Sequence, residues 1–335
     1  MVATIGATLP TLVDLANRLD PDGKIAAIAE YLNQSNEVLA DMRWQEGNLP
    51  TGERTTVRVG LPTVGFRALN EGVARSKSRT AQVDEGAAML EGNSQVDRKL
   101  AILSGDIGGY RLSESTSFFE AMNQTMATTV FYGNAATSPK AFTGFGPRFN
   151  TIGNQVIDAG GTGTDNLSIW LIAWGRQVYG IYPKGTKGGL FHFDMSGYAG
   201  MGDDGYPAGI EVQDADGNPY LGFKDHYEWN CGLSVKDPRY VVRIANIDRS
   251  LMTADISTGA NIQDLMVQAT EHIQSTDGAV FYMPRTVRGM LRRQLLNKKN
   301  PYLSYDEVAG KKVVNFDGIP VRRVDALKAD EARVV

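Results

Sequence analysis

The sequence predicts an α+β fold, and three observations support this class. Hydrophobic residues make up 42% of the 335-residue chain and charged residues 21%, which is ordinary globular usage. The 37 glycines indicate many turns and long loops rather than a helical bundle. Segments with helical periodicity also alternate with short apolar runs of the strand type. The length is sufficient for one large domain or two modest ones.

Charge and cysteine content exclude several classes of protein. With 34 basic and 38 acidic residues the net charge is −4, which argues against a generally basic coat on nucleic acid. No apolar stretch reaches the roughly 18 residues of a membrane-spanning helix, and the amino terminus lacks the basic start of an export signal. The single Cys231 has no partner for an internal disulfide. We therefore expect a soluble protein that is made in the cytoplasm and has no membrane partner.

The first 50 residues are predicted to be helical and loosely organised. Thr11 and Asp14 fit a capping box at the start of a short helix, and Asp20-Pro21 fits the start of a second one. The second helix carries one apolar stripe at helical spacing, formed by Ile25, Ile28, Leu32, Leu39 and Met42. The stripe is expected to pack on the protein's own core, with packing on a neighbouring subunit as the alternative.

Residues 51–83 alternate, are rich in Thr, Val and Arg, and are interrupted by glycine and proline. This pattern predicts a long two-stranded projection. Two acidic residues, Glu53 and Glu71, are outnumbered in it by six basic ones: Arg54, Arg58, Arg67, Arg75, Lys77 and Arg79. Because an isolated hairpin is barely stable, this one should lie on its own body or on a partner.

The clearest helix follows an S-x-x-E capping box at Ser117–Glu120, although Ser113 is an alternative start one turn earlier. Its predicted end is at Gly133-Asn134, a common left-handed terminator. The residues expected to pack along it recur at i+4 steps: Phe118, Met122, Met126 and Val130.

The middle third is predicted to be β-rich, with strands over 168–174, 178–182, 190–194, 208–213, 220–224 and 239–247. Asp216-Gly217 indicates a hairpin turn. Between residues 188 and 223 there is no Lys or Arg, but there are six acidic residues: Asp194, Asp203, Asp204, Glu211, Asp214 and Asp216. This acidic block is a plausible complement to the basic hairpin, within one subunit or between subunits.

The last third alternates helices and strands. Helices are predicted over 262–273 and after Pro284, and a strand over 279–283. Two further strands, 312–316 and 319–324, are joined by Asp317-Gly318 as a hairpin.

The sequence contains no recognisable catalytic, cofactor or metal site. Its three histidines have no second His or Cys at metal-ligand spacing, and nucleophile-elbow, phosphate-loop and dinucleotide motifs are absent. A metal-independent hydrolase or transferase is one rival interpretation. A carbohydrate-binding or decoration module is the other, suggested by aromatic residues that are better explained as core: Trp170, Trp174, Tyr179 and Tyr182.

The order of these elements resembles that of tailed-bacteriophage major capsid proteins of the Hong Kong phage ninety-seven type. The resemblance rests on the arm, the basic hairpin and the long helix closed by Phe131-Tyr-Gly-Asn134. Two later segments support it: Met283-Pro-Arg-Thr-Val-Arg-Gly-Met-Leu-Arg-Arg and Phe316-Asp-Gly-Ile-Pro-Val-Arg-Arg-Val-Asp-Ala-Leu. Candidate peripheral strands precede the second segment instead of following it. This permuted order resembles the short-tailed subgroup of epsilon-fifteen and a Bordetella phage.

The resemblance implies an N-terminal arm (1–50), an extended loop (51–93), a peripheral domain (94–250) with a spine helix (112–132), and an axial domain (251–335). It implies a structural protein without cofactors. Its copies would form hexamers and pentamers of an icosahedral shell around double-stranded DNA, without specific DNA contacts. Further implied partners are a scaffold, a portal and a decoration or staple protein. The protein would be located in the virion capsid after assembly in the bacterial host cytoplasm.

Residues expected at contacts between subunits come from three segments of the chain. The loop supplies the six basic residues Arg54, Arg58, Arg67, Arg75, Lys77 and Arg79. The arm supplies Ile25, Ile28 and Leu32, and the acidic block supplies Asp203, Asp204 and Glu211.

Overall fold

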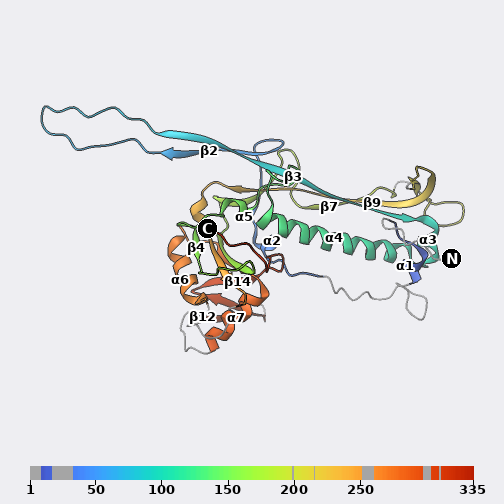
Figure 1. Ribbon diagram of the computed structural model, residues 1–335. Helices are drawn as coiled ribbons and strands as arrows, with labels where there is room; N and C mark the ends of the chain where they lie inside the picture. Colours follow the sequence, from blue (N-terminus) through green and yellow to red (C-terminus); the bar gives the residue numbers. More distant parts are fainter. Residues whose placement is uncertain are drawn as a thin grey trace. The chain divides into compact units, whose positions relative to one another are not determined.

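A computed structural model describes residues 9–16, 33–197, 200–214, 216–250, 260–296, 303–308 and 311–335 (Figure 1). The chain divides into two compact units. Unit 1 is formed by Met1–Gln34, Met89–Met126 and Gly189–Asn230, and unit 2 by Ser35–Ala88, Ala127–Gly188 and Cys231–Val335. Three elements contribute residues to both units: β3 (Arg79–Asp97), α4 (Ile107–Tyr132) and β9 (Pro219–Val235).

Unit 1 begins with the short helix α1 (Leu12–Ala16), and its predicted capping box is confirmed. The Thr11 backbone N–H donates to the Asp14 carboxylate at 2.8 Å, and the Asp14 N–H donates to the Thr11 hydroxyl at 3.4 Å. A small core of unit 1 gathers around this helix and α3 (Arg98–Leu103): Leu15, Val96, Leu100, Ala101, Tyr110 and Phe223. Ile25, Ile28 and Leu32 lie outside the described residues.

The helix α4 starts earlier than residue 112, and the predicted capping box at Ser117 is wrong. Its first turn is capped instead by Asp106, whose carboxylate accepts the N–H of Gly109 at 2.9 Å. Ser113 lies inside the helix and donates to the Tyr110 carbonyl at 3.0 Å. A serine inside a helix can donate its hydroxyl to a carbonyl of the preceding turn. In the sequence such a serine looks the same as a capping serine, which explains the error.

In unit 1, β7 (Leu190–Asp194) and β8 (Ile210–Gln213) both pair antiparallel with β9. The turn predicted at Asp216-Gly217 joins β8 to β9. The Asp214 carboxylate accepts the N–H groups of Asp216 and Asn218 at 3.0 and 2.8 Å, and Gly217 has a φ of 85°. A positive φ explains the glycine at this position.

Unit 2 contains a seven-stranded sheet in the order β12-β13-β14-β11-β5-β10-β4. Its strands are β4 (Val156–Asp158), β5 (Asn166–Ala173), β10 (Val241–Asp248), β11 (Ala279–Met283), β12 (Leu303–Val308), β13 (Lys311–Phe316) and β14 (Ile319–Arg323). The helices α6 (Ile262–His272) and α7 (Arg285–Leu296) add apolar residues to the same core. The predicted β13–β14 hairpin is confirmed, with Asp317 and Gly318 at φ 51° and 75°.

This sheet differs from the domain boundary predicted at residue 250. β5 and β10 fall in the predicted peripheral segment 94–250, but they pair with each other, and β5 also pairs with β11 of the predicted axial segment. Both strands are buried almost throughout, so they belong at the centre of a covered sheet.

Residues 35–50 are integrated into unit 2 and do not form a separate arm. Only α2 (Val38–Asp41) is helical there, and Val38 and Met42 are buried. β1 (Trp44–Glu46) pairs parallel with β6 (Val178–Tyr182). Within residues 33–50 the predicted helix is therefore limited to Val38–Asp41, because Val38 and Met42 pack in unit 2 and Trp44–Glu46 form a strand.

The C-terminal segment after β14 is bound into unit 2 by contacts with residues far away in the sequence. The Ala326 N–H donates to the Asn36 side chain at 3.1 Å. Asn246 accepts the Val334 N–H at 2.8 Å and donates to the Val334 carbonyl at 2.9 Å. Leu327 and Val334 are buried. This segment is therefore part of the core of unit 2.

Candidate assembly surface

The predicted projection is an antiparallel hairpin of unit 2, formed by β2 (Gly52–Gly60) and the start of β3, with Arg54 opposite Asp84 and Arg58 opposite Thr80. We call residues 52–86 the extended hairpin and Leu61–Ser78 its tip. In Figure 1 the hairpin is the long pair of a blue strand (β2) and a cyan strand (β3) that projects beyond the other strands of unit 2. Every residue of the tip is exposed.

The tip displays large apolar side chains. Leu61, Val64, Phe66 and Leu69 are 81%, 86%, 109% and 92% exposed. Contiguous apolar side chains left in water by a monomer usually mark a contact surface. The basic residues of this segment were predicted from composition, and the apolar ones were not. Their sequence signal is a run of apolar residues broken by glycine and proline, too irregular to form a core strand.

The basic residues of the hairpin lie on its surface. Arg54 forms a two-pronged ion pair with Asp84, with both distances 2.6 Å, and one Arg67 nitrogen donates to the Glu71 carbonyl at 3.2 Å. Among the described residues, no carboxylate lies within ion-pair distance of five of them: Arg58, Arg67, Arg75, Lys77 and Arg79. The hairpin therefore presents positive charge beside its apolar tip.

Two buried carboxylates fix the base of the hairpin. Glu53 accepts the Tyr179 hydroxyl at 2.6 Å and pairs with Lys236 at 3.2 Å. Glu85 pairs with both terminal nitrogens of Arg148 at 2.6 and 2.5 Å. Burial, together with the hydrogen bond to Glu53, raises the pKa of Tyr179, so its hydroxyl keeps its proton. These contacts attach the base of the hairpin to the rest of unit 2.

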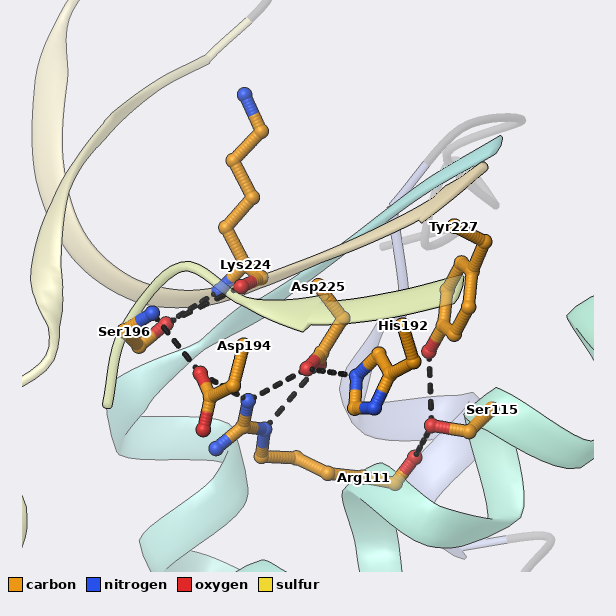
Figure 2. Close-up of polar contacts among 8 residues, drawn as sticks. All are labelled: Arg111, Ser115, His192, Asp194, Ser196, Lys224, Asp225 and Tyr227. Carbon is orange, nitrogen blue, oxygen red and sulfur yellow. Dashed lines mark hydrogen bonds and ion pairs between the residues drawn. The ribbon is translucent and has the colours of Figure 1, made fainter. Parts of the chain in front are cut away.

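Unit 1 contains a second polar cluster, which joins α4 to β7 and β9 (Figure 2). Arg111 pairs with Asp225 at 2.6 Å and with Asp194 at 2.7 Å. His192 Nε2 lies 2.9 Å from Asp225, and its ring stacks on Tyr227 with centroids 5.1 Å apart.

This cluster does not have the geometry of a nucleophilic site. The Ser115 hydroxyl contacts the Tyr227 hydroxyl at 2.7 Å and the Arg111 carbonyl at 2.9 Å, while the neighbour of His192 is Asp225 (Figure 2). A serine nucleophile needs a base within hydrogen-bond reach, and His192 is not its partner. The cluster is a structural brace.

We expect Arg111→Ala to lower the stability of unit 1 by about 2 kcal/mol at neutral pH, between the values typical of exposed and buried ion pairs. Burial alone would raise the pKa of Asp194, but its hydrogen bonds to Arg111 and Ser196 leave that pKa lowered. A lowered pKa gives stability that is complete above the ordinary aspartate value of about 3.9 and is lost as the pH falls through the folded value. The stability difference from wild type should therefore shrink below about pH 4.

Urea unfolding at pH 7 and at acid pH measures this difference. Lys99→Ala is the control, because Lys99 is exposed and forms no ion pair among the described residues. If Arg111→Ala loses the same unfolding free energy at both pH values, the expected role of the carboxylates is wrong.

The acidic candidates lie in unit 1. Asp204 pairs with Arg98 at 2.6 Å, whereas Asp203 and Glu211 are exposed with no described cation in ion-pair distance. Of the residues predicted to pack along α4, Met122, Met126 and Val130 are buried. Phe118 is half-buried and stacks on Tyr227 at 5.1 Å.

The described residues contain no group of three or more His, Cys, Asp or Glu side chains placed to hold a metal ion. In the same part of the chain no helix has the length and apolar character needed to cross a membrane. Trp170, Trp174 and Tyr179 are buried in unit 2, so they offer no surface for stacking on a sugar.

Comparisons with known proteins give consistent results. The family model of the major capsid protein GP7 matches residues 20–335. The structure is similar to a chain of bacteriophage epsilon15 solved by cryo-EM, with a TM-score of 0.74, 33% identity, and coverage of 99% of this chain and 100% of that one. Lower similarity is found to the bacteriophage JBD30 capsid (TM-score 0.46, 11% identity, 90% and 91% coverage) and to the capsid of an empty GTA particle (0.42, 8%, 70% and 97%). No curated protein matches the sequence.

Proposed function

The chain belongs to the family of GP7 major capsid proteins, and we propose that its copies assemble as hexamers and pentamers of an icosahedral shell around double-stranded DNA. Membership makes it a structural protein of the phage virion and not an enzyme, with the α+β fold of phage capsids. The observation that carries the proposed mechanism is the extended hairpin, whose apolar tip is exposed on its own protomer.

Assembly proceeds by covering such surfaces with neighbouring copies. A lasting contact between subunits buries more than about 1,000 Å². The tip offers exposed apolar side chains to such a contact, and contacts repeated over a closed lattice add through multivalency. Covalent disulfide links take no part, because Cys231 is buried, and burial raises the pKa of its thiol to about 12.

Other partners follow from the same role. Assembly takes place in the host cytoplasm on a separate scaffold, with a portal at one vertex and a decoration or staple protein on the shell. The net charge of −4 suits an inner surface that does not bind packaged DNA tightly, so DNA is enclosed without specific contacts.

The proposed function is tested by expressing the full chain and examining it by sedimentation and electron microscopy. A shell protein gives capsomers or large closed particles. Monomers or small irregular oligomers, at all protein concentrations and with a scaffold supplied, would contradict the proposal.

We expect reversal of Arg58, Arg67 and Arg75 to Glu to reduce the yield of particles at low ionic strength, with a smaller deficit at about 1 M salt, where charges are screened within about 3 Å. Light scattering during assembly at several salt concentrations measures the effect. The same reversal at exposed positions outside the hairpin, Lys140, Lys184 and Arg292, is the control. A yield at low salt equal to wild type would remove the electrostatic part of the mechanism.

A further inference from the structure

The outer edge of β2 is only partly covered. At Gly52 the edge is paired with Leu49, with the Leu49 N–H donating to the Gly52 carbonyl at 3.0 Å and the Gly52 N–H donating back at 3.2 Å. At Arg54 the side-chain amide of Asn48 replaces a strand. Its Nδ2 donates to the Arg54 carbonyl at 2.7 Å, and its Oδ1 accepts the Arg54 N–H at 2.8 Å.

These contacts show which residues of β2 face away from β3. In an antiparallel pair the backbone groups of alternate residues point toward the partner strand and away from it. Because Gly52 and Arg54 point outward, Thr56 and Arg58 are the next two outward residues. β2 is the last strand of its sheet, and no described residue bonds to the outward groups of Thr56 or Arg58. An open strand edge of this kind readily accepts another strand.

A groove runs beside this open edge within unit 2. Its volume is about 670 Å³, and it is lined by Thr55–Val59, Gln177 and Lys236–Arg239. The Thr55 hydroxyl is buried at its wall without a hydrogen-bond partner. Lys236 pairs with Glu53, and Arg239 pairs with Asp237 at 2.7 Å, so Arg58 is the uncompensated charge of the groove.

Unit 1 carries a matching open edge on β8. The Asp214 N–H donates to the Asn218 carbonyl at 3.0 Å inside the β8–β9 hairpin. By the same alternation Ile210 and Val212 face β9, whereas Glu211 and Gln213 face outward. β8 pairs only with β9 among the described strands, and Glu211 is exposed. The Gln213 carbonyl accepts the Gln95 side-chain amide at 3.1 Å, so the edge is open at Glu211 and partly covered at Gln213. β8 has four residues, the same length as the open stretch of β2 from Thr56 to Val59, and it lies in a segment without Lys or Arg.

We propose that Thr56–Val59 of one copy pair antiparallel with Ile210–Gln213 of a second copy, with Arg58 opposite Glu211 and Thr56 opposite Gln213. The proposal rests on the proposed shell function and names one of its contacts. Outward residues placed opposite each other exchange both backbone hydrogen bonds, which Arg58 and Glu211 can do. Gln213 offers its N–H to Thr56, while its carbonyl already accepts the Gln95 amide. The side chains of directly opposite residues lie on the same face of the sheet, where opposite charges attract. The incoming strand continues the pairing that Leu49 and Asn48 begin.

A charge exchange tests the register. Arg58→Glu and Glu211→Arg should each raise the protein concentration needed for assembly about tenfold, since each places like charges opposite one another. The double variant restores the pair and should assemble near the wild-type concentration. Arg58→Glu combined with Asp203→Arg is the control, because it restores net charge at another exposed acidic residue of unit 1. Rescue by both doubles, or by neither, would overturn the register.

Hydrogen exchange of the wild-type protein tests the backbone pairing without any substitution. The amides of Thr56, Arg58 and Glu211 should exchange quickly in the free subunit and at least about a hundredfold more slowly in particles. The Arg54 amide, already bonded to Asn48, is the internal reference. If particles form but these amides stay fast, the strand pairing is wrong and the shell function stands. If no particles form, the proposed function fails and the inference fails with it.

A proline at Thr56 removes only an outward N–H and should block particle formation while the subunit stays folded. Val57→Pro is the matched control, because the Val57 N–H points toward β3 and its loss should open the hairpin of the free subunit. Normal assembly of Thr56→Pro would contradict the inference.

Discussion

Replacing Glu331 by alanine is expected to lower the stability of unit 2 by about 3–5 kcal/mol, the usual result of breaking a buried ion pair. Glu331 accepts a hydrogen bond from Arg243 at 2.8 Å, and both side chains are only 6% exposed. It also accepts the hydroxyls of Tyr132 and Ser168. Without the carboxylate, the Arg243 guanidinium remains buried, and its hydrogen-bond partners among the described residues are the Ser168 hydroxyl and the Phe149 carbonyl. It also lies over the Trp170 ring, which carries no compensating charge.

Urea unfolding of Glu331→Ala against wild type measures this loss. Asp330→Ala is the matched control, because Asp330 is exposed one residue earlier in the same segment. Glu331→Gln keeps a hydrogen-bond acceptor and removes the charge. Its loss of stability should therefore be smaller than that of Glu331→Ala. Equal unfolding midpoints for Glu331→Ala and Asp330→Ala would show that Arg243 is stabilised in another way.

Deleting the tip Leu61–Ser78 and joining Gly60 to Arg79 through Asn-Gly is expected to abolish particle formation. The stability of the subunit should change by no more than about 0.5 kcal/mol, because the deleted residues bury nothing on their own protomer. The Asn-Gly turn suits a hairpin whose strands already pair at Gly60 and Arg79. A larger deletion that included Glu53 would also remove a buried partner of Tyr179 and Lys236.

Sedimentation and electron microscopy measure assembly, and urea unfolding measures stability. A second variant with Phe66→Ser and Leu69→Ser keeps the length of the tip and removes apolar surface, so its assembly should be weakened and not lost. Particles formed by the deletion variant at wild-type concentrations would show that the tip is dispensable. A subunit that fails to fold would show that the tip belongs to the core.

Local elements of the fold were predictable because their signals are local. The strands at 178–182, 190–194 and 279–283 agree with β6, β7 and β11, since each is a short apolar run between turn residues. The long strand β9 was predicted over residues 220–224 and not as one continuous strand to Val235. Its continuation begins with Asp225 and His226, whose polar character hides a strand that is paired on both sides.

Pairings between distant segments could not be predicted from the pattern. β11 and β14 pair in parallel, and β5 pairs with β10 and β11, so the predicted division at residue 250 differs from the sheet. The apolar runs indicate that these strands are buried, but they do not indicate which strands pair with each other. The burial of Glu331 likewise has no sequence signal, because its partner Arg243 is 88 positions away.

The candidate assembly surface was predicted in part. The basic character of residues 54–79 is visible in composition, and so is the two-stranded form of the hairpin. In the sequence Glu53 is one acidic residue among basic ones, whereas in the structure it binds Tyr179 and Lys236. The Asn48 side-chain amide bonds to the Arg54 backbone as a neighbouring strand would. This role could not be predicted from the sequence, because it depends on where the two residues lie in three dimensions.

The attachment of the C-terminal segment also affects when the protein becomes competent to associate during synthesis. Ser35 forms a hydrogen bond with Asp325, and Asn36 forms one with Ala326, each pair 290 positions apart. Asn246 forms its hydrogen bond with Val334. A growing polypeptide thus exposes its hairpin on the ribosome well before these late residues emerge to complete unit 2. Contacts of such long sequence separation form slowly. Unit 2 therefore reaches its final packing only after residues 325–334 have been synthesised.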